Sequence, residues 1–249
     1  MAKAMLIDTD LCLDCNACTV ECKRNNEVPV GQHIAWTEMQ EFEVGTFPKV
    51  NTYFMKRACN HCTEASCMNV CPTGAISKTD GVHVVIDQEW CIGCGYCTAA
   101  CPFEIPHFGE PKGSAQKCRF CYGTKADDEP TACASACPYG AITFGERDAL
   151  VLAGRGRVEQ LRKQGKATAN LYGEKELGGL NVLYVLADRP AAYGLPENPK
   201  VATKATGSNW LSGIATAGAL ALLPFWTLFK RKEALAAEAA AEKEKESAK

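Results

Sequence analysis

Several features that mark common classes of protein are missing from this sequence. Basic residues are not in excess, because 27 Lys and Arg accompany 29 Asp and Glu, and this balance argues against a nucleic-acid-binding protein. The first residues, MAKAMLIDTD, do not form the charged and then apolar segment of a secretory signal, so we expect no such signal here. We also find no Ser/His/Asp set, phosphate-binding loop or pair of carboxylates in a catalytic pattern, and therefore expect no catalytic centre.

Cysteine is absent after Cys137, and all 16 cysteines lie between Cys12 and that residue. Disulfide scaffolds are typical of shorter secreted chains, and structural zinc sites use pairs of cysteines separated by a dozen or more residues. Residues 91–102, CIGCGYCTAACP, instead follow the ferredoxin pattern C-x2-C-x2-C-x3-C-P, which holds iron–sulfur clusters. The spacing therefore favours iron–sulfur ligation over zinc or disulfides.

The cysteines form four runs, each made of a C-x2-C pair, a variable gap and a C-x3-C pair. The flanks repeat as well, because I-D-x3-C begins at Ile7 and at Ile86, and C-P-x-G-A-I begins at Cys71 and at Cys137. Apolar stretches beside these motifs predict short strands. We expect an α+β fold of duplicated ferredoxin-like units of the bacterial two-cluster type. The unit with the second and third runs is inserted into a unit made of the first and fourth.

In such a run, the first three thiolates bind one cluster and the fourth binds the neighbouring cluster. Applied to the duplication, this rule predicts four 4Fe–4S clusters and no 3Fe–4S cluster, and it uses each cysteine once. The predicted ligands are Cys59, Cys62, Cys67 and Cys101 for cluster A; Cys91, Cys94, Cys97 and Cys71 for cluster B; Cys12, Cys15, Cys18 and Cys137 for cluster C; and Cys118, Cys121, Cys133 and Cys22 for cluster D. The four histidines are then not needed as ligands.

Two charged residues beside the fourth run have more than one interpretation. Lys117 and Arg119 flank Cys118. They either raise the reduction potential of a nearby cluster, contact a partner, or are simply solvated.

The soluble part of the chain is expected to have two segments. Residues 1–146 form the four-cluster domain, a split repeat into which the 59–101 region is inserted. Residues 147–206 hold a helix, a strand and an extended arm that contacts a partner. The arm, at 188–201, reads DRPAAYGLPENPKV, which is too polar and too broken by proline for a place in the core.

The last part of the sequence indicates a membrane anchor. Residues 210–229 carry no charge, and at ~1.5 Å per residue they reach about 30 Å, the thickness of a bilayer core. We therefore predict a transmembrane helix at 207–230, in contact with membrane lipid, and a charged Ala/Glu/Lys tail at 231–249. Lys230, Arg231 and Lys232 follow the apolar span directly. An excess of Lys and Arg marks the cytoplasmic side, so we expect a single pass through the cytoplasmic membrane with the cluster domain on the periplasmic side.

The chain resembles a known family in its four cysteine runs. The four runs, above all the spacing C-x2-C-x11-C-x3-C of the fourth, are similar to those of the four-cluster ferredoxin subunit of molybdenum- or tungsten-bisPGD oxidoreductases and of some membrane-bound nickel–iron hydrogenases. The resemblance covers about residues 4–145. The stretch NVLYVLADRPAAYGLPENPKV, followed by one apolar helix, is most similar to the β subunit of membrane-bound respiratory formate dehydrogenase. Asp14 departs from this pattern, because a glycine is usual there.

The resemblance implies an electron-transfer subunit that is not an enzyme by itself. It would carry electrons through four 4Fe–4S clusters between a catalytic molybdenum or tungsten subunit, here of formate dehydrogenase, and a membrane cytochrome b or quinone-binding subunit. The alternatives are the iron–sulfur subunit of a membrane-bound nickel–iron hydrogenase or of another bisPGD reductase complex, and a free-standing membrane ferredoxin. Neither the substrate nor the order of the cluster potentials is encoded in an identifiable motif.

Overall fold

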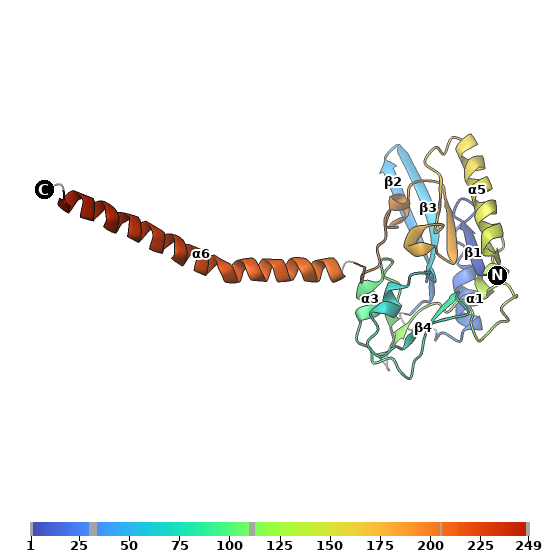
Figure 1. Ribbon diagram of the computed structural model, residues 1–249. Helices are drawn as coiled ribbons and strands as arrows, with labels where there is room; N and C mark the ends of the chain where they lie inside the picture. The colour runs from blue at the N-terminus through green and yellow to red at the C-terminus, as the bar shows by residue number, and fades with distance from the viewer. Residues whose placement is uncertain (1, 30–33, 110–112, 205, 248–249) are drawn as a thin grey trace. The chain divides into compact units, whose positions relative to one another are not determined.

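The computed structural model describes residues 2–29, 34–109, 113–204 and 206–247 (Figure 1). The chain forms two units, Met1–Thr203 and Lys204–Lys249. The strands are β1 (Lys3–Asp8), β2 (Thr37–Thr46), β3 (Lys49–Ala58), β4 (Ile76–Thr79), β5 (His83–Ile86), β6 (His107–Phe108), β7 (Ala115–Gln116), β8 (Ile142–Glu146), β9 (Asn170–Tyr172) and β10 (Val182–Leu186). The α-helices are α1 (Ala17–Asn25), α2 (Ser66–Asn69), α3 (Tyr96–Ala100), α4 (Ala132–Ser135), α5 (Arg147–Lys163) and α6 (Thr206–Ser247), and the 3₁₀ helices are η1 (Glu176–Gly178) and η2 (Pro190–Tyr193).

The predicted duplication is visible in the strand register. β1 and β8 pair antiparallel, with Ile7 opposite Ile142. β4 and β5 also pair antiparallel, with Ile76 opposite Ile86. In both pairs the isoleucine of an I-D-x3-C motif therefore lies opposite the isoleucine of a C-P-x-G-A-I motif. Each pair of strands thus brings the start of one cysteine run beside the end of another, and the α+β ferredoxin-like expectation is confirmed.

A four-stranded sheet joins the N-terminal repeat to the segment after residue 146. Its order is β8-β1-β10-β9, and β10 runs parallel to β1. Helix α5 lies against one face of this sheet, where it contacts β1 and β10 (Figure 1). The sheet therefore crosses the domain boundary that we expected at residue 146.

The two faces of the sheet pack against different parts of the molecule. Ala4 and Leu6 of β1 face α5 and pack with Val158 and Leu161. The alternate residues of β1, Met5 and Ile7, point to the opposite face, because successive side chains of a strand alternate. On that face they pack in a cluster that also contains cysteines of the runs. The sheet thus separates an ordinary hydrophobic core from the cysteine-rich side.

The proline-rich arm is not outside the core, so that expectation was wrong. Tyr193 is fully buried, and Leu195 and Val201 are also part of the main hydrophobic cluster. The Tyr193 hydroxyl accepts hydrogen bonds from the Thr9 hydroxyl at 3.1 Å and from the Ala187 N–H at 3.1 Å. These bonds satisfy its polar atom, so the aromatic ring can be buried at little cost.

The C-terminal unit contains α6, which includes the predicted span. Within the part of the chain that the structure describes, one helix, at Trp210–Leu235, is long and apolar enough to cross a membrane. Pro224 lies inside this helix, and the Thr227 hydroxyl donates a hydrogen bond of 2.8 Å to its carbonyl. The expected tail is a helical continuation of the same element as far as Ser247.

Candidate iron–sulfur sites

All four cysteine runs contain the same backbone turn before their second cysteine. The residue at that position has a positive φ in every run: 52° at Asp14, 46° at His61, 71° at Gly93 and 63° at Phe120. This left-handed conformation is usual for glycine and tolerated by Asp, Asn and His, but it is uncommon for other residues. Asp14 therefore adopts the conformation of the glycine that it replaces.

Short helices follow the turns and carry the third cysteine of each run. These helices are α1, α2, α3 and α4, which hold Cys18, Cys67, Cys97 and Cys133 respectively. Helix α1 contacts α4, and α2 contacts α3. The helices thus meet in the same pairs as the runs in the predicted duplication, first with fourth and second with third.

Two cavities are each lined by one predicted set of four cysteines. The first cavity contains the complete set predicted for cluster C: Cys12, Cys15, Cys18 and Cys137. The second contains the complete set predicted for cluster B: Cys71, Cys91, Cys94 and Cys97. In both cavities three cysteines of one run stand with the last cysteine of another.

The set predicted for cluster A also comes together. Burial, and then the charges of Cys59, Cys101 and Cys67, raise the pKa of the Cys62 thiol. These three neighbours and Cys62 are the four members of the set.

The set predicted for cluster D meets in the same way. Burial raises the pKa of Cys118, and the charges of Cys22 and Cys133 raise it further. The charges of Cys133 and Cys121 also raise the pKa of Cys22 after burial. The last cysteine of the first run thus lies among the first three of the fourth run.

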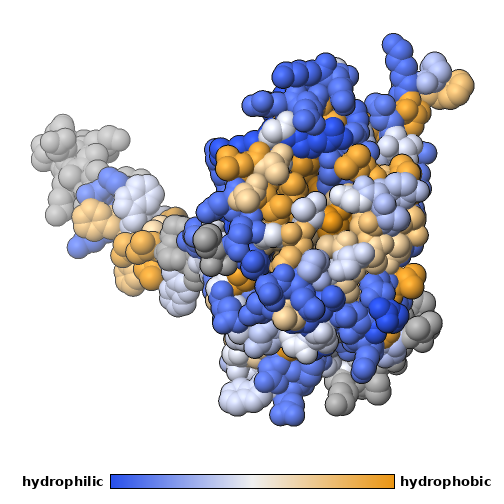
Figure 2. All heavy atoms as spheres, turned by 90° about the vertical axis from the view of Figure 1, so that its right-hand side faces the viewer, coloured by the Kyte–Doolittle hydropathy of each residue, from blue (hydrophilic) through white to orange (hydrophobic). Residues whose placement is uncertain are grey.

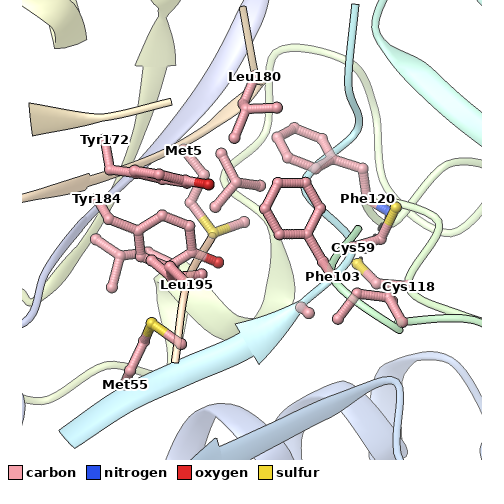
Figure 3. Close-up of a cluster of buried hydrophobic side chains, with 14 of the residues drawn as sticks. Met5, Met55, Cys59, Phe103, Cys118, Phe120, Tyr172, Leu180, Tyr184 and Leu195 are labelled. Atoms are coloured by element: carbon pink, nitrogen blue, oxygen red, sulfur yellow. Dashed lines mark hydrogen bonds between the residues drawn. The ribbon is translucent and has the colours of Figure 1, made fainter. Parts of the chain in front are cut away.

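Neighbouring sets are also in electrostatic contact with each other. The charge of Cys97 contributes to the pKa of Cys67, which burial chiefly raises to about 12. Cys59 acts in the same direction on Cys118, and Figure 3 shows these two side chains next to each other beside Phe103 and Phe120. Cys133 acts on Cys18, whose pKa burial raises to about 11. The four sets therefore follow each other in the order B, A, D, C.

Burial also distinguishes the ends of this row from its middle. In set C Cys15 is exposed, and in set B Cys94 is exposed. In set D all four cysteines are buried, whereas in set A Cys59 is buried and the other three are half-buried. The two outer sets are thus the ones that solvent or a partner can reach.

Several N–H groups point at cysteine sulfurs, as expected for iron–sulfur ligands. The backbone N–H of Ala115 donates to Cys91 Sγ at 3.4 Å, that of Phe120 to Cys118 Sγ at 3.3 Å, and that of Ala132 to Cys121 Sγ at 3.4 Å. Such hydrogen bonds offset the negative charge of a cluster and tune its potential. Four converging thiols with N–H donors around them fit a 4Fe–4S cluster, which supplies one-electron redox chemistry when bound.

Two buried lysines lie among the cysteines. Lys117 is 5% exposed, and its Nζ donates to the carbonyl oxygens of Val84 and, at 3.0 Å, of Cys118. The solvated alternative is therefore excluded for Lys117. Lys56 of β3 is 1% exposed and lies in the cavity lined by set C. Sequence reasoning missed Lys56, because the sequence of β3 does not distinguish this buried lysine from the exposed Lys49 of the same strand.

Arg119 is half-buried and His61 is fully buried, and both have protein partners. The Arg119 guanidinium lies 5.3 Å from the centre of the Trp36 ring, in a cation–π contact. His61 is fully buried, and its Nδ1 accepts a hydrogen bond of 3.0 Å from the Val84 N–H. Burial, and then the charge of Lys117, hold the pKa of His61 well below its usual value. The imidazole is therefore neutral.

Comparison with known proteins places these features in a family. The 4Fe–4S dicluster domain family matches residues 50–147. The formate dehydrogenase-O iron–sulfur subunit of Escherichia coli (strain K12) is 37% identical over 216 residues, which cover 80% of this chain and 72% of that one. The chain belongs to the family of iron–sulfur subunits that includes those of formate dehydrogenases. Members of this family hold 4Fe–4S clusters and transfer electrons, and this chain does the same.

Two further relatives show how wide the family is. The iron–sulfur subunit of the nitrate-inducible formate dehydrogenase of Escherichia coli (strain K12) is 35% identical over 239 residues, which cover 88% of this chain and 81% of that one. The thiosulfate reductase electron transfer subunit of Salmonella typhi is 36% identical over 177 residues, which cover 70% of this chain and 92% of that one. One family of iron–sulfur subunits therefore serves enzymes with different substrates.

Proposed function

We propose that this chain carries electrons through four 4Fe–4S clusters, held by the ligand sets A to D predicted above, between a catalytic bisPGD molybdenum or tungsten subunit and a membrane subunit. The observation that carries the proposal is the convergence of the cysteines in four groups of four. Two groups line cavities, and the other two are linked by the mutual effect of their charges. We assign the oxidation or reduction of the substrate to the catalytic subunit and electron transfer to this chain.

The electron path follows the order of the sets. Clusters B and C are its ends, and A and D are its middle. Each transfer step moves one electron, so that one cluster is oxidised as its neighbour is reduced. Sets A and D have no exposed cysteine and exchange electrons only with their neighbours, whereas sets B and C each have an exposed cysteine and can exchange electrons with partner subunits.

The end with cluster B faces the membrane in this proposal. The last residues of the first unit lie beside α2, because the Ala202 N–H donates to Ser66 Oγ at 3.3 Å and Asn69 Nδ2 donates to Thr203 Oγ1 at 3.4 Å. Helix α2 carries Cys67 of set A and leads directly to Cys71 of set B. The predicted membrane helix starts in the sequence just after this point, which supports an exit through cluster B.

Exposed hydrophobic residues at both ends support partner surfaces there. Around set B, Trp90 and Ile92 are exposed, and around set C, Leu13 and Tyr139 are exposed. Solvent-exposed apolar side chains next to redox sites are suited to partner contacts. Figure 2 shows hydrophobic residues at the surface between hydrophilic ones on the α5 side of Figure 1. We assign the surface at set B to the membrane cytochrome b or quinone-binding subunit, and that at set C to the catalytic subunit.

The catalytic partner is a formate dehydrogenase in our proposal. Formate dehydrogenase iron–sulfur subunits match this chain over as much as 88% of its length. A second candidate is a sulfur-compound reductase, because the thiosulfate reductase relative is almost as similar and is covered over 92% of its length. The chain is anchored in the cytoplasmic membrane by a single helix, with the cluster domain on the periplasmic side.

Purification of the complex in mild detergent tests this function. We expect about sixteen iron atoms and as many sulfides per copy of this chain, and a large molybdenum or tungsten subunit that oxidises formate with a quinone analogue as electron acceptor. A large nickel–iron subunit would assign the chain to a hydrogenase instead, and a chain that purifies alone would make it a free-standing ferredoxin. About eight iron atoms, or zinc, would contradict the four-cluster assignment itself.

A further inference from the structure

Lys56 is a charged side chain in an unusual place. It is 1% exposed, on the β3 strand, and belongs to the largest fully buried side chains among the described residues. A buried ammonium group without a compensating negative charge is very costly. Among the described residues, no ion pair joins Lys56 to a carboxylate. Its compensating charge must come from another source.

The neighbours of Lys56 are cysteines of two different sets. Burial raises the pKa of Cys18 of set C and of Cys118 and Cys22 of set D. The charge of Lys56 lowers the pKa of each of these thiols, so Lys56 lies near both sets. Lys56 also lines the cavity of set C. Its position is therefore shared by the sets that would hold clusters C and D.

The second buried lysine has a different environment. Lys117 Nζ donates to two backbone carbonyl oxygens, Val84 and Cys118, so the protein itself solvates its charge. Lys56 has no such acceptor among the described residues, but it lines one cavity with the four cysteines of set C. Against the effect of burial, the charges of Cys133 and Cys118 of set D also raise its pKa. As thiolates on a cluster, these cysteines would supply the compensating negative charge. A 4Fe–4S cluster with four thiolates is anionic and becomes more negative on reduction. A nearby cation therefore stabilises the reduced state more than the oxidised state.

We propose that Lys56 is a fixed positive charge shared by clusters C and D, and that it raises the reduction potentials of both. The proposal rests on the ligand sets given under the proposed function. In electron transfer, Lys56 acts as a positioning charge rather than as an electron carrier. It stabilises an electron on clusters C and D relative to clusters A and B, which lie nearer the proposed membrane exit. The driving force for electron transfer from D to A is therefore lower.

The test is a redox titration of the purified complex, with dithionite as the reductant and EPR as the readout. We compare the native protein with Lys56→Met and Lys56→Gln, which remove the charge, and with Lys56→Arg, which keeps it. Lys49→Met is the matched control, because Lys49 is on the same strand but exposed. We expect the neutral variants to lower the equilibrium constant for reduction at least tenfold for two of the four clusters, which corresponds to about 59 mV for one electron. Lys56→Arg and Lys49→Met should stay near the native values.

Iron content separates this inference from the proposed function. If the native complex lacks four clusters, the ligand assignment fails. If it has them, unchanged potentials in a fully loaded Lys56→Met or Lys56→Gln protein overturn the role of Lys56 alone. Iron loss in both neutral variants with full loading of Lys56→Arg also supports the proposal, because the charge is then needed to hold the clusters. Equal iron loss in Lys56→Arg contradicts it, because the shape of the side chain would then matter and not its charge.

Discussion

The Nε atom of Arg157, on α5, lies 2.6 Å from Oδ2 of Asp8, the last residue of β1. The same guanidinium reaches Asp10 Oδ2 at 2.8 Å, and Lys166 Nζ also contacts Asp10. Asp8 in turn accepts a hydrogen bond of 3.0 Å from the Asp10 N–H through Oδ1. This network fixes the chain at the point where β1 ends and the loop to Cys12 begins. It therefore holds the first cysteine run from the opposite face of the sheet.

Loss of this anchor should weaken both the fold and cluster C. We expect Arg157→Met to destabilise the protein by about 2–3 kcal/mol, because Asp8 is buried and would lose a charged partner. Arg155→Met is the control on the same helix. Arg155 pairs with Glu174 but is exposed, so its loss should destabilise the protein much less than the loss of Arg157. Anaerobic thermal unfolding, followed by cluster absorbance, measures the difference. Equal shifts for the two variants would show that the network does not matter.

A second prediction concerns the contact between α5 and the sheet. A Cβ on Gly154 would stand 2.7 Å from Leu171 Cδ1, whereas a Cβ on Gly156 meets nothing within 4 Å. Alanine favours a helix over glycine by about 1 kcal/mol. Gly156→Ala should therefore raise the midpoint of thermal unfolding by about 2–4 °C. Gly154→Ala should lose this gain or reverse it, because α5 must move away from the sheet. A comparable rise for Gly154→Ala would mean that Leu171 moves aside freely.

The turn at Asp14 gives a third prediction. Its φ of 52° is that of a left-handed residue, as at Gly93 in the third run. Asp14→Gly should leave cluster content unchanged and stabilise the protein slightly. Asp14→Val should destabilise it by about 1–3 kcal/mol, because a β-branched residue is strained in this conformation. The same unfolding measurement, with iron analysis, separates the two. A stable Asp14→Val protein with full iron would show that the turn can change its conformation.

These residues show what a sequence can predict for this fold. The cysteine spacing and the repeated I-D and G-A-I motifs predicted the strands at β1, β4, β5 and β8, because those patterns encode short-range structure. The burial of Tyr193 and Lys56 depends instead on partners far away in the sequence, such as Thr9 and Cys133. Polarity and proline content suggested a solvated arm. However, a tyrosine whose hydroxyl makes its hydrogen bonds, as Tyr193 does, can be buried in a hydrophobic core. Likewise, a lysine in an alternating strand looks exposed until the anionic sites around it are known.

The pairing of runs across the duplication leads to a fourth prediction. Cys101 should serve the same cluster as Cys59, and not the cluster of its own run, which contains Cys91. Single Cys→Ser variants at these positions should each lose about four iron atoms. In the double variants, Cys101→Ser with Cys59→Ser should again lose about four, whereas Cys101→Ser with Cys91→Ser should lose about eight. Non-additive loss identifies groups that act on one cluster. If the pattern of the two double variants were reversed, each run would bind its own cluster.

The last prediction places the two ends of the membrane helix. Lys230, Arg231 and Lys232 follow the apolar span, while the preceding flank has Lys200 and Lys204 within about ten residues of it. Because Lys and Arg are enriched on the cytoplasmic side, the tail should lie inside and the cluster domain outside. Clusters are inserted before export, so the domain would cross the membrane folded, bound to a partner with a twin-arginine signal.

Labelling in intact spheroplasts tests this orientation. A cysteine introduced by Ser247→Cys should react with a membrane-impermeant maleimide after lysis but not before. The parent chain is the control, because its 16 cysteines are all assigned to clusters and should give the same background before and after lysis. Labelling of the new cysteine in unlysed spheroplasts would place the tail outside. The cluster domain would then lie in the cytoplasm, and cluster B would deliver electrons to the inner face of the membrane.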